Sequence, residues 1–453
     1  MLLRPKLWEG LTLTQSPHVG EKIRALRLKM GMTQQDLAGT DFTKSFISQI
    51  EKNHARPSLK SLQIIADRLG KPISYFLDED YVPHSSDPDK IDHLILLASH
   101  LEQEDKITEA VNYYKEALSL ADKTDYRRRG QLCFYLAKAY LKLGQTANAA
   151  QMLELAGVEL KLAGDSELLI YAFNSLGDLE LDRGNLKQAV SAFEEALAVA
   201  EHHLERMPEL QTMTLTNLGI AYARSREYER ARHNLLKALG QSESTQAYYK
   251  YGDICMALGY IDFHQNDLDN ACRFTTRAWH FYAAIENEDM QIQCQINLGS
   301  IERARGEFET AEQHLLEAAE KARNAGASHH EAHAYEELSR VYLAWQPPAA
   351  ERAAAAEGIL RKALELSTSD KTGLRQLLAE ACVQQGKIDE GINILLTVAA
   401  SLEGAKAEPS LADVYSRLGE LYHQQGDSQR ATAFLQQSVN IFRKLQLKDP
   451  VVQ

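Results

Sequence analysis

Cysteine is scarce in this sequence and follows no recognisable pattern. Five cysteines occur in 453 residues, none of them in a CxxC pair: Cys133, Cys255, Cys272, Cys294 and Cys382. An odd number of scattered thiols argues against a disulfide framework. We therefore expect a reducing compartment, with the thiols used as small core residues.

Long apolar runs are missing as well. No stretch of 18 or more apolar residues occurs, which excludes an ordinary membrane-spanning helix. The first residues, MLLRPKLWEGLTLTQSP, contain neither the apolar stretch nor the small-residue cleavage site of a signal peptide. These absences predict a cytoplasmic protein.

The sequence also lacks the usual marks of catalysis. It has no glycine-rich phosphate loop, and its fifteen histidines are scattered, with the two His-His pairs at 202–203 and 329–330 expected near helix ends. The abundant acidic residues stand beside Lys and Arg in the sequence, a pattern typical of solvent-exposed helix faces. We therefore expect no enzyme activity, no catalytic residue, no metal and no cofactor.

Charge is divided unevenly along the chain. Residues 1–77 hold twelve Lys/Arg and six Asp/Glu, a balance of +6, whereas the remainder holds 38 Lys/Arg and 57 Asp/Glu, a balance of −19. A basic head on an acidic body indicates that binding to a polyanion is confined to the head.

The head, residues 18–77, has the pattern of five short helices. Apolar residues recur at helical spacing, and capping residues separate the segments: Thr33, Thr43 and Ser58 stand where helices begin, Gly31 and Gly70 stand where they end, and Pro72 opens the fifth. Five short helices in about 60 residues predict a compact all-α domain.

This order of features resembles the repressor-type helix-turn-helix of the XRE (Cro/C1) family. The resemblance implies that the helix after Thr43 enters the major groove of double-stranded operator DNA. It implies DNA contacts from the following residues: Gln34, Thr43, Lys44, Ser45, Ser48, Gln49, Lys52, Asn53 and His54. It also implies a structural pair between Arg27 and Glu51.

The segment between Leu37 and Glu51 departs from that family. It is one residue shorter than the common form of the motif, so which side chain meets which base is left open. The alternative for the head is a helical domain that binds protein, as in some antitoxin-like relatives. The excess of basic residues in the head favours DNA over protein as its partner.

Residues 78–90, rich in Pro and Ser, are predicted to be a linker, and beyond them the chain repeats. A small residue recurs about every 40 positions, once with a gap of 80 around the interruption AWQPPAAERAAAA: Ala110, Ala149, Ala189, Ala231, Ala271, Ala311, Gly391 and Ala431. This spacing predicts nine helical hairpins.

The units resemble tetratricopeptide repeats, with Gly177, Gly219, Gly259, Gly299 and Gly419 in their first helices. The resemblance covers residues 91–445 and implies a right-handed superhelix with a concave face suited to an extended peptide or a helix. The expected fold is therefore all-α, a DNA-binding head followed by a repeat domain. Residues 1–17 are a leader of unknown role, and 446–453 a tail.

Several polar residues of the first helices are expected at the concave face. Asn can bind a peptide backbone through donor and acceptor, and Arg can hold a carboxylate. The candidate peptide-binding residues are Asn174, Asn217, Arg224, Asn297, Arg303 and Arg340. The alternative is that they are ordinary exposed helix residues.

A repressor-type head before such an array looks like the RRNPP regulators of Gram-positive bacteria, which include Rap- and PlcR-type proteins. The resemblance implies a transcriptional regulator, a homodimer, controlled by a short signalling peptide in the repeat groove, as in quorum sensing. The alternatives are repeats that bind a protein partner, a Rap-like effector of a response-regulator phosphotransfer protein, and a scaffold with a vestigial head.

Overall fold

The chain folds into helices and turns. The computed structural model describes residues 19–52, 54–55, 57, 59–71, 76, 88–202, 208–245, 248, 250–345, 350–368, 371–405 and 408–448. Throughout these ranges no β-strand occurs, which confirms the predicted all-α class. The chain forms two compact units, Met1–Ala221 and Tyr222–Gln453.

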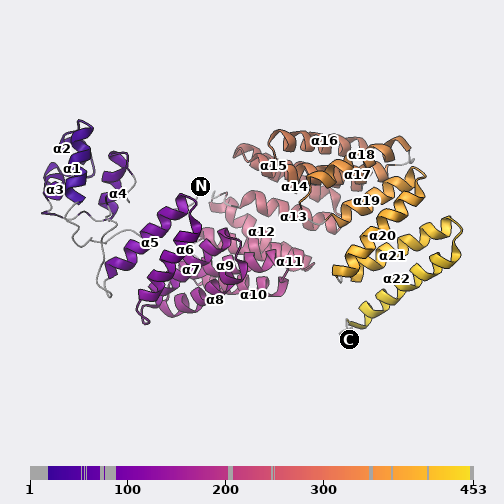
Figure 1. The fold of residues 1–453 in the computed structure, drawn as a ribbon, viewed down its shortest axis with the longest axis horizontal. Coiled ribbons are helices and arrows are strands. Elements are labelled where there is room, and N and C mark those ends of the chain that lie inside the picture. Colours follow the sequence, from indigo (N-terminus) through magenta and orange to yellow (C-terminus); the bar gives the residue numbers. More distant parts are fainter. Residues whose placement is uncertain are drawn as a thin grey trace. The chain divides into compact units, whose positions relative to one another are not determined.

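The head begins the first unit and consists of four described helices: α1 (Val19–Lys29), α2 (Gln34–Ala38), α3 (Lys44–Glu51) and α4 (Leu59–Arg68) (Figure 1). Their apolar faces meet in one core that includes Ile23, Leu37, Ile47 and Ile65. The predicted cap Ser58 and most of the predicted fifth helix fall outside the described residues. Phe76 from that segment is described and fully buried.

The rest of the first unit is a series of hairpins. Its helices are α5 (Pro88–Gln103), α6 (Ile107–Leu120), α7 (Tyr126–Lys142), α8 (Thr146–Ala163), α9 (Ser166–Asp182), α10 (Leu186–Glu201) and α11 (Pro208–Arg224), the last crossing the boundary between the units. Helix α5 begins at Pro88, so three residues assigned to the linker belong to the array.

The second unit continues the same pattern. Its helices are α12 (Tyr228–Thr245), α13 (Tyr251–His264), α14 (Leu268–Ala284), α15 (Glu288–Arg305), α16 (Phe308–Asn324), α17 (Ser328–Ala344), α18 (Ala350–Leu366), α19 (Thr372–Gln384), α20 (Ile388–Ala405), α21 (Glu408–Gln424) and α22 (Ser428–Lys448). Helix α22 extends three residues past the predicted end of the array at 445. The Pro-Pro interruption lies outside the described residues, between α17 and α18.

Small residues allow the two helices of a hairpin to approach closely. A Cβ atom added to Gly177 of α9 would stand 2.4 Å from the Phe193 ring of α10, and one added to Gly299 of α15 would stand 2.5 Å from Leu315 of α16. Ala189 and Ala311, which open the second helices, are fully buried. The close packing follows from the small residues that marked the repeat in the sequence.

The cysteines lie inside this helical packing. All five are free; Cys272 is half-buried and the other four are buried. Burial raises the pKa of the Cys133 thiol to about 11, which keeps it protonated near neutral pH. The thiols therefore pack as small apolar side chains. Among the described helices, none combines the length and the apolar character needed to cross a bilayer.

Replacing Gly177 with alanine tests the close approach of α9 and α10. The added methyl group overlaps Phe193, so we expect Gly177→Ala to lower the free energy of unfolding by about 1–3 kcal/mol. The matched control is Gly240→Ala in α12, where nothing lies within 4 Å of the added Cβ. The control should be neutral or stabilising by up to about 1 kcal/mol. Thermal unfolding followed by circular dichroism measures both, and equal effects would refute the packing argument.

Candidate functional site

Helix α3 presents polar side chains to solvent while its apolar side anchors it in the head. Thr43 caps the start of the helix, and its Oγ1 accepts a hydrogen bond of 3.2 Å from the Phe46 backbone N–H. Ile47 and Ile50 are buried in the core. The predicted DNA-contacting residues of this segment are exposed, apart from half-buried Ser48: Thr43, Lys44, Ser45, Gln49, Lys52 and His54. Asn53 lies outside the described residues.

A buried ion pair fixes α3 against α1. Arg27 donates to both carboxylate oxygens of Glu51, from Nε at 2.5 Å and from Nη2 at 2.9 Å. Burial by itself would raise the pKa of Glu51, but hydrogen bonds from Arg27 and Gln34 outweigh it and lower that pKa below its ordinary value. The structure thus brings together the pair that the resemblance implied.

Gln34 lies in the same network. Its Nε2 donates to Glu51 Oε2 at 2.8 Å, so the side chain is tied to the end of α3. Thr33, just before it, forms a capping box with Asp36 at the start of α2. The hydrogen bond lets Gln34 help to orient α3, and its expected contact with DNA stays a prediction.

Arg68 stabilises the short turn between α2 and α3 through hydrogen bonds and an ion pair. Its Nη1 donates to the carbonyls of Leu37 at 2.8 Å and Ala38 at 2.6 Å, and its Nη2 forms an ion pair with Asp41. The guanidinium therefore pairs with the Leu37 carbonyl at the end of α2 and shares the Ala38 carbonyl with the Phe42 backbone N–H. Gly39 has φ +54°, and a Cβ added there would meet Arg68 at 2.6 Å. Arg68 carries no local signal in the sequence, because about thirty positions separate it from the turn.

Two predicted peptide-binding residues of the first unit are engaged with each other. Asn174 is only 3% exposed and donates from Nδ2 to the Ile170 carbonyl at 2.9 Å and to Thr214 Oγ1 at 2.8 Å. Asn217 donates to Asn174 Oδ1 at 3.1 Å. These side chains join α9 to α11 in the interior, so the expectation of an open asparagine at 174 and 217 is corrected by their burial.

Arg224 and Asn297 do not join that cluster. Arg224 is exposed at the end of α11. Asn297 of α15 is half-buried, and its Oδ1 accepts from Gln293 Nε2 at 3.0 Å. Asn297 therefore remains at a partly open surface of the second unit.

The other two predicted arginines converge on one carboxylate. Glu337 of α17 accepts from Ser300 Oγ at 2.9 Å, forms an ion pair with Arg340, and lies 3.7 Å from Arg303 Nη2. Arg340 also donates to Glu336 at 2.7 Å. The Nε atom of Arg303 is buried without a hydrogen-bond partner. Arg303 is thus the less satisfied of the two cations.

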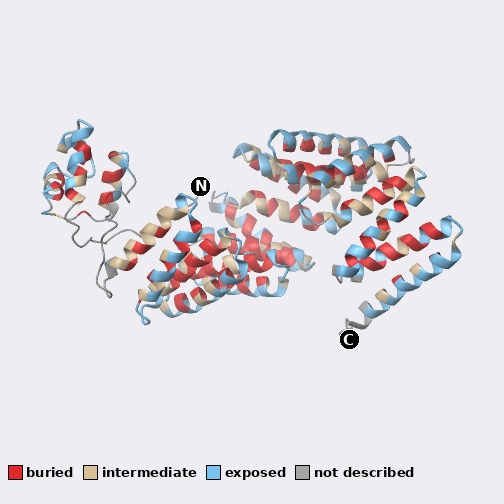
Figure 2. Cartoon of the chain, in the orientation of Figure 1, coloured by how far each residue is buried: buried red, intermediate tan, exposed pale blue. Residues whose placement is uncertain are grey.

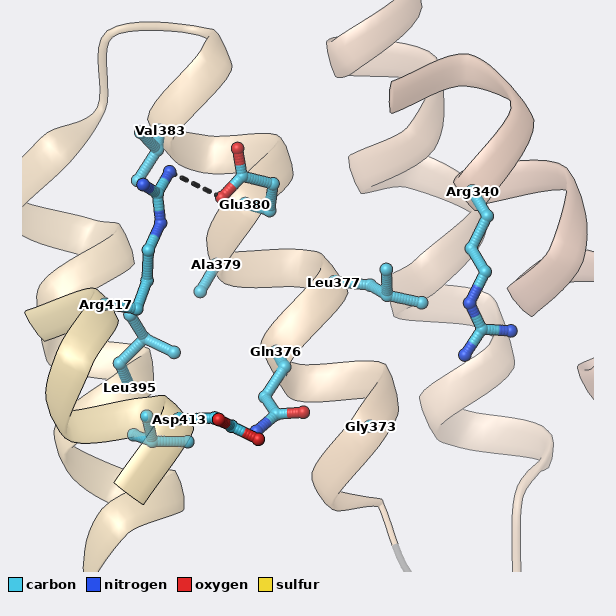
Figure 3. Close-up of a pocket in the computed structure, with 11 residues that line it drawn as sticks. Arg340, Gly373, Gln376, Leu377, Ala379, Glu380, Val383, Leu395, Asp413 and Arg417 are labelled. Atoms are coloured by element: carbon cyan, nitrogen blue, oxygen red, sulfur yellow. Dashed lines mark hydrogen bonds and ion pairs between the residues drawn. The ribbon is translucent and has the colours of Figure 1, made fainter. Parts of the chain in front are cut away.

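A pocket of about 320 Å³ opens beside Arg340, on the first helices of the last three hairpins (Figure 3). Its polar lining includes Gln376 and Glu380 of α19 and Asp413 and Arg417 of α21. Arg417 donates to Glu380 at 2.7 Å, whereas Gln376 and Asp413 extend into the space between the two helices.

These pocket residues were not among the predicted site residues, because their repeat has Leu378-Ala379 where other repeats have Leu-Gly. A weak signal exists. Gly299 precedes the turn glycine Gly306 by seven residues, and Ala379 precedes Gly386 by the same number. Aligning the units on the turn glycines Gly386 and Gly184 matches Gln376 with Asn174, a position already selected, and Glu380 with Asp178.

One cluster of metal-ligand type occurs among the described residues. Glu357, Cys382 and Glu390 have their ligand atoms within 4.8 Å of one another. However, Arg361 and Lys387 each donate to Glu357 at 2.7 Å. Hydrogen bonds from Lys387, Arg361 and Gln385 lower the pKa of Glu357 to about 2. Two cations already neutralise this group, so the cluster is an ion-pair network.

Removing the Arg68 side chain tests whether its guanidinium stabilises the turn between α2 and α3. Arg68→Ala leaves the Leu37 carbonyl without its donor and removes one of the two donors to the Ala38 carbonyl, so we expect the head to lose about 1–3 kcal/mol of stability. Gln35→Ala, an exposed change on α2, is the control and should be nearly neutral. Hydrogen exchange of the α3 amides measures the local effect. Unchanged protection in Arg68→Ala would contradict the assigned role.

Family models match the two parts of the chain separately. A helix-turn-helix model matches residues 23–76, and tetratricopeptide-repeat models match residues 169–206, 216–271, 292–331 and 372–444. No curated protein matches the chain.

Solved structures share the fold at low sequence identity. The apo form of RapI is 15% identical, with a TM-score of 0.56 over 79% of this chain and 98% of its own. The apo quorum sensor NprR from B. thuringiensis is 13% identical, with a TM-score of 0.56 over 78% and 97%. A Rap protein complexed with competence and sporulation factor is 14% identical, with a TM-score of 0.53 over 80% and 99%. The chain therefore combines an XRE-type helix-turn-helix domain with tetratricopeptide repeats, in a fold similar to the Rap and NprR proteins.

Proposed function

We propose that this protein is a cytoplasmic transcriptional regulator that binds operator DNA through α3 and is controlled by a short peptide bound to its repeat domain. The observation that carries the proposal is the exposed polar start of α3, held on a helix pair by the Arg27–Glu51 ion pair. A rigid helix with an exposed polar N-terminal half is what insertion into a major groove requires.

Electrostatics supports DNA as the partner of the head. The head has a balance of +6 in a chain whose net charge is −13. Lys44, at the first turn of α3, and Lys52, just after it, are exposed at the two ends of the reading helix. Because each cation that neutralises a phosphate releases a counterion, binding weakens as salt rises. The acidic body favours contact through the head alone.

The pocket in the second unit supports a peptide as the ligand. Gln376 offers both a donor and an acceptor, which matches the backbone of an extended peptide. Arg340 and Arg417 match a carboxylate, while Asp413 matches an amine or a basic side chain. Arg303 and Asn297 of α15 supply further polar groups on another first helix of the same unit. A peptide carries an amine, a carboxylate and repeating backbone amides, so it can pair with all of these side chains.

Control requires that the peptide distinguish two states of the protein. A ligand shifts an equilibrium only by the difference between its affinities for the two conformations. In a repeat array, small rotations at successive hairpin interfaces add along the chain. We propose that the regulator acts as a homodimer, because one head of this size contacts few bases and two-fold operators match two-fold proteins.

Substitution of the α3 surface tests DNA binding. We expect Lys44→Ala/Gln49→Ala to weaken binding to the protein's own upstream DNA by about tenfold or more at fixed salt, because a phosphate contact and a base contact are lost. Thermal stability should not change, because both side chains are exposed. Operator binding is measured by electrophoretic mobility shift, with and without synthetic peptides. The peptides are those encoded by small reading frames next to the gene.

The control for this experiment is Lys237→Ala in α12, outside the head, which should leave the shift unchanged. Equal operator affinity in the wild type and the α3 variant would contradict the proposal that α3 contacts DNA. A specific shift that no peptide alters would remove the peptide from the proposal and favour a protein partner in the repeats.

Filling the pocket tests ligand binding. A side chain at Gly373 has room, because a Cβ there would meet only Glu336 Oε1, at 3.8 Å. We expect Gly373→Leu to lower affinity for an active peptide by about tenfold or more while operator binding is retained. Gly358→Leu, on an open face of α18, is the matched control. Calorimetric titration measures the affinity, and unchanged binding in Gly373→Leu would exclude this pocket.

A further inference from the structure

The last helix of the array leaves a stacking surface open. In the second helix of a hairpin, three positions follow the small residue at its start by four, eight and eleven residues. In α16 these are Leu315, Ala319 and Ala322, at most 2% exposed. In α20 they are Leu395, Ala399 and Leu402, at most 6% exposed.

In α22 the same three positions are Leu435, Val439 and Phe442, which are 40%, 47% and 41% exposed. We call them the terminal stacking face. Exposed residues run along α22 in Figure 2. The end of a repeat array ordinarily has a polar outer surface that keeps it in solution. Here the end keeps the apolar residues that elsewhere in the array are covered by the next hairpin.

The array itself shows what covers such a face. Helix α17 packs on α16, and Ala332, Tyr335 and Leu338 join Leu315 and Ala319 in one core cluster. A helix with small and aromatic residues on one side is therefore the shape that fits. Nothing in the described part of the chain occupies this place on α22.

Charge identifies the kind of helix that fits the terminal stacking face. The 21 residues of α22 include four basic residues and no acidic residue, in a chain with a net charge of −13. Arg323 of α16 shows how such a cation is used, because its Nε donates to Glu331 of α17 at 2.8 Å. Arg443 stands at the same position in α22, twelve residues after the small residue, and is exposed. No described residue pairs with Arg443.

We propose that the terminal stacking face binds an acidic amphipathic helix of another protein, with a carboxylate against Arg443 and apolar residues over Val439 and Phe442. A second copy of α22 fits less well, because two helices with four basic residues each and no acidic residue repel one another. The proposal stands apart from the proposed function, since neither the head nor the peptide pocket takes part in it.

The probe is a fluorescein-labelled synthetic peptide with the sequence of α17, Ser328–Ala344, which already covers the equivalent face of α16. Fluorescence anisotropy with the full-length protein measures its affinity. We expect saturable binding that weakens by about tenfold or more in Val439→Glu/Phe442→Glu, because apolar contacts are lost. Leu316→Glu in α16 is the control, because Leu316 is 47% exposed but lies off the stacking positions.

A charge exchange tests the register. Arg443→Glu should weaken binding by about two- to fivefold, and a peptide carrying Glu331→Arg should recover that loss. Circular dichroism melting confirms that the variants are folded. Absence of saturable binding, or an equal loss in Leu316→Glu, would overturn the proposal. Sedimentation velocity of the protein alone adds a further check: a wild-type dimer that Val439→Glu/Phe442→Glu converts to monomer would assign the face to a second copy instead.

Discussion

The close approach of paired helices at small residues is the constraint on which the rest of this structure depends. A Cβ added at Gly177, Gly299 or Gly419 would stand 2.4–2.6 Å from an aromatic or leucine side chain of the partner helix. Helices this close leave little freedom in how hairpins pack. Polar residues on the first helices α17, α19 and α21 line the same pocket beside Arg340.

The head depends on a different interaction. Arg27, Glu51 and Gln34 form a buried polar network between α1, α2 and α3, in which the carboxylate accepts three hydrogen bonds. A buried carboxylate is tolerated when its partners compensate for lost hydration. The network holds the end of α3 in one orientation, while Arg68 holds the turn before it. The short turn between α2 and α3 is thereby compatible with a fixed orientation of α3.

Charge in the repeats is largely paired within the protein. Glu337 is shared by Ser300 and Arg340, Arg417 is bound to Glu380, and Arg361 to Glu357. Ion pairs therefore orient many charged side chains of the body, while its balance of −19 leaves an excess of acidic groups. The less satisfied groups, Arg303 in α15 and Arg443 at the end of α22, are informative because they differ from this pattern.

The sequence by itself determined the all-α class, the division into a head and a repeat array, and the positions of the close helix contacts. Caps, glycines and recurring small residues act locally or at fixed spacing, so their effect can be read in order along the chain. The exposed face of α3 followed from the same helical period. Only the tertiary structure decided that Asn174 and Asn217 are buried against each other, that Arg68 reaches the α2–α3 turn, and that Gln376 and Asp413 line one pocket. These outcomes depend on which side chains meet across helices some 30 to 40 residues apart, and small rotations of a helix decide between an open face and a buried contact.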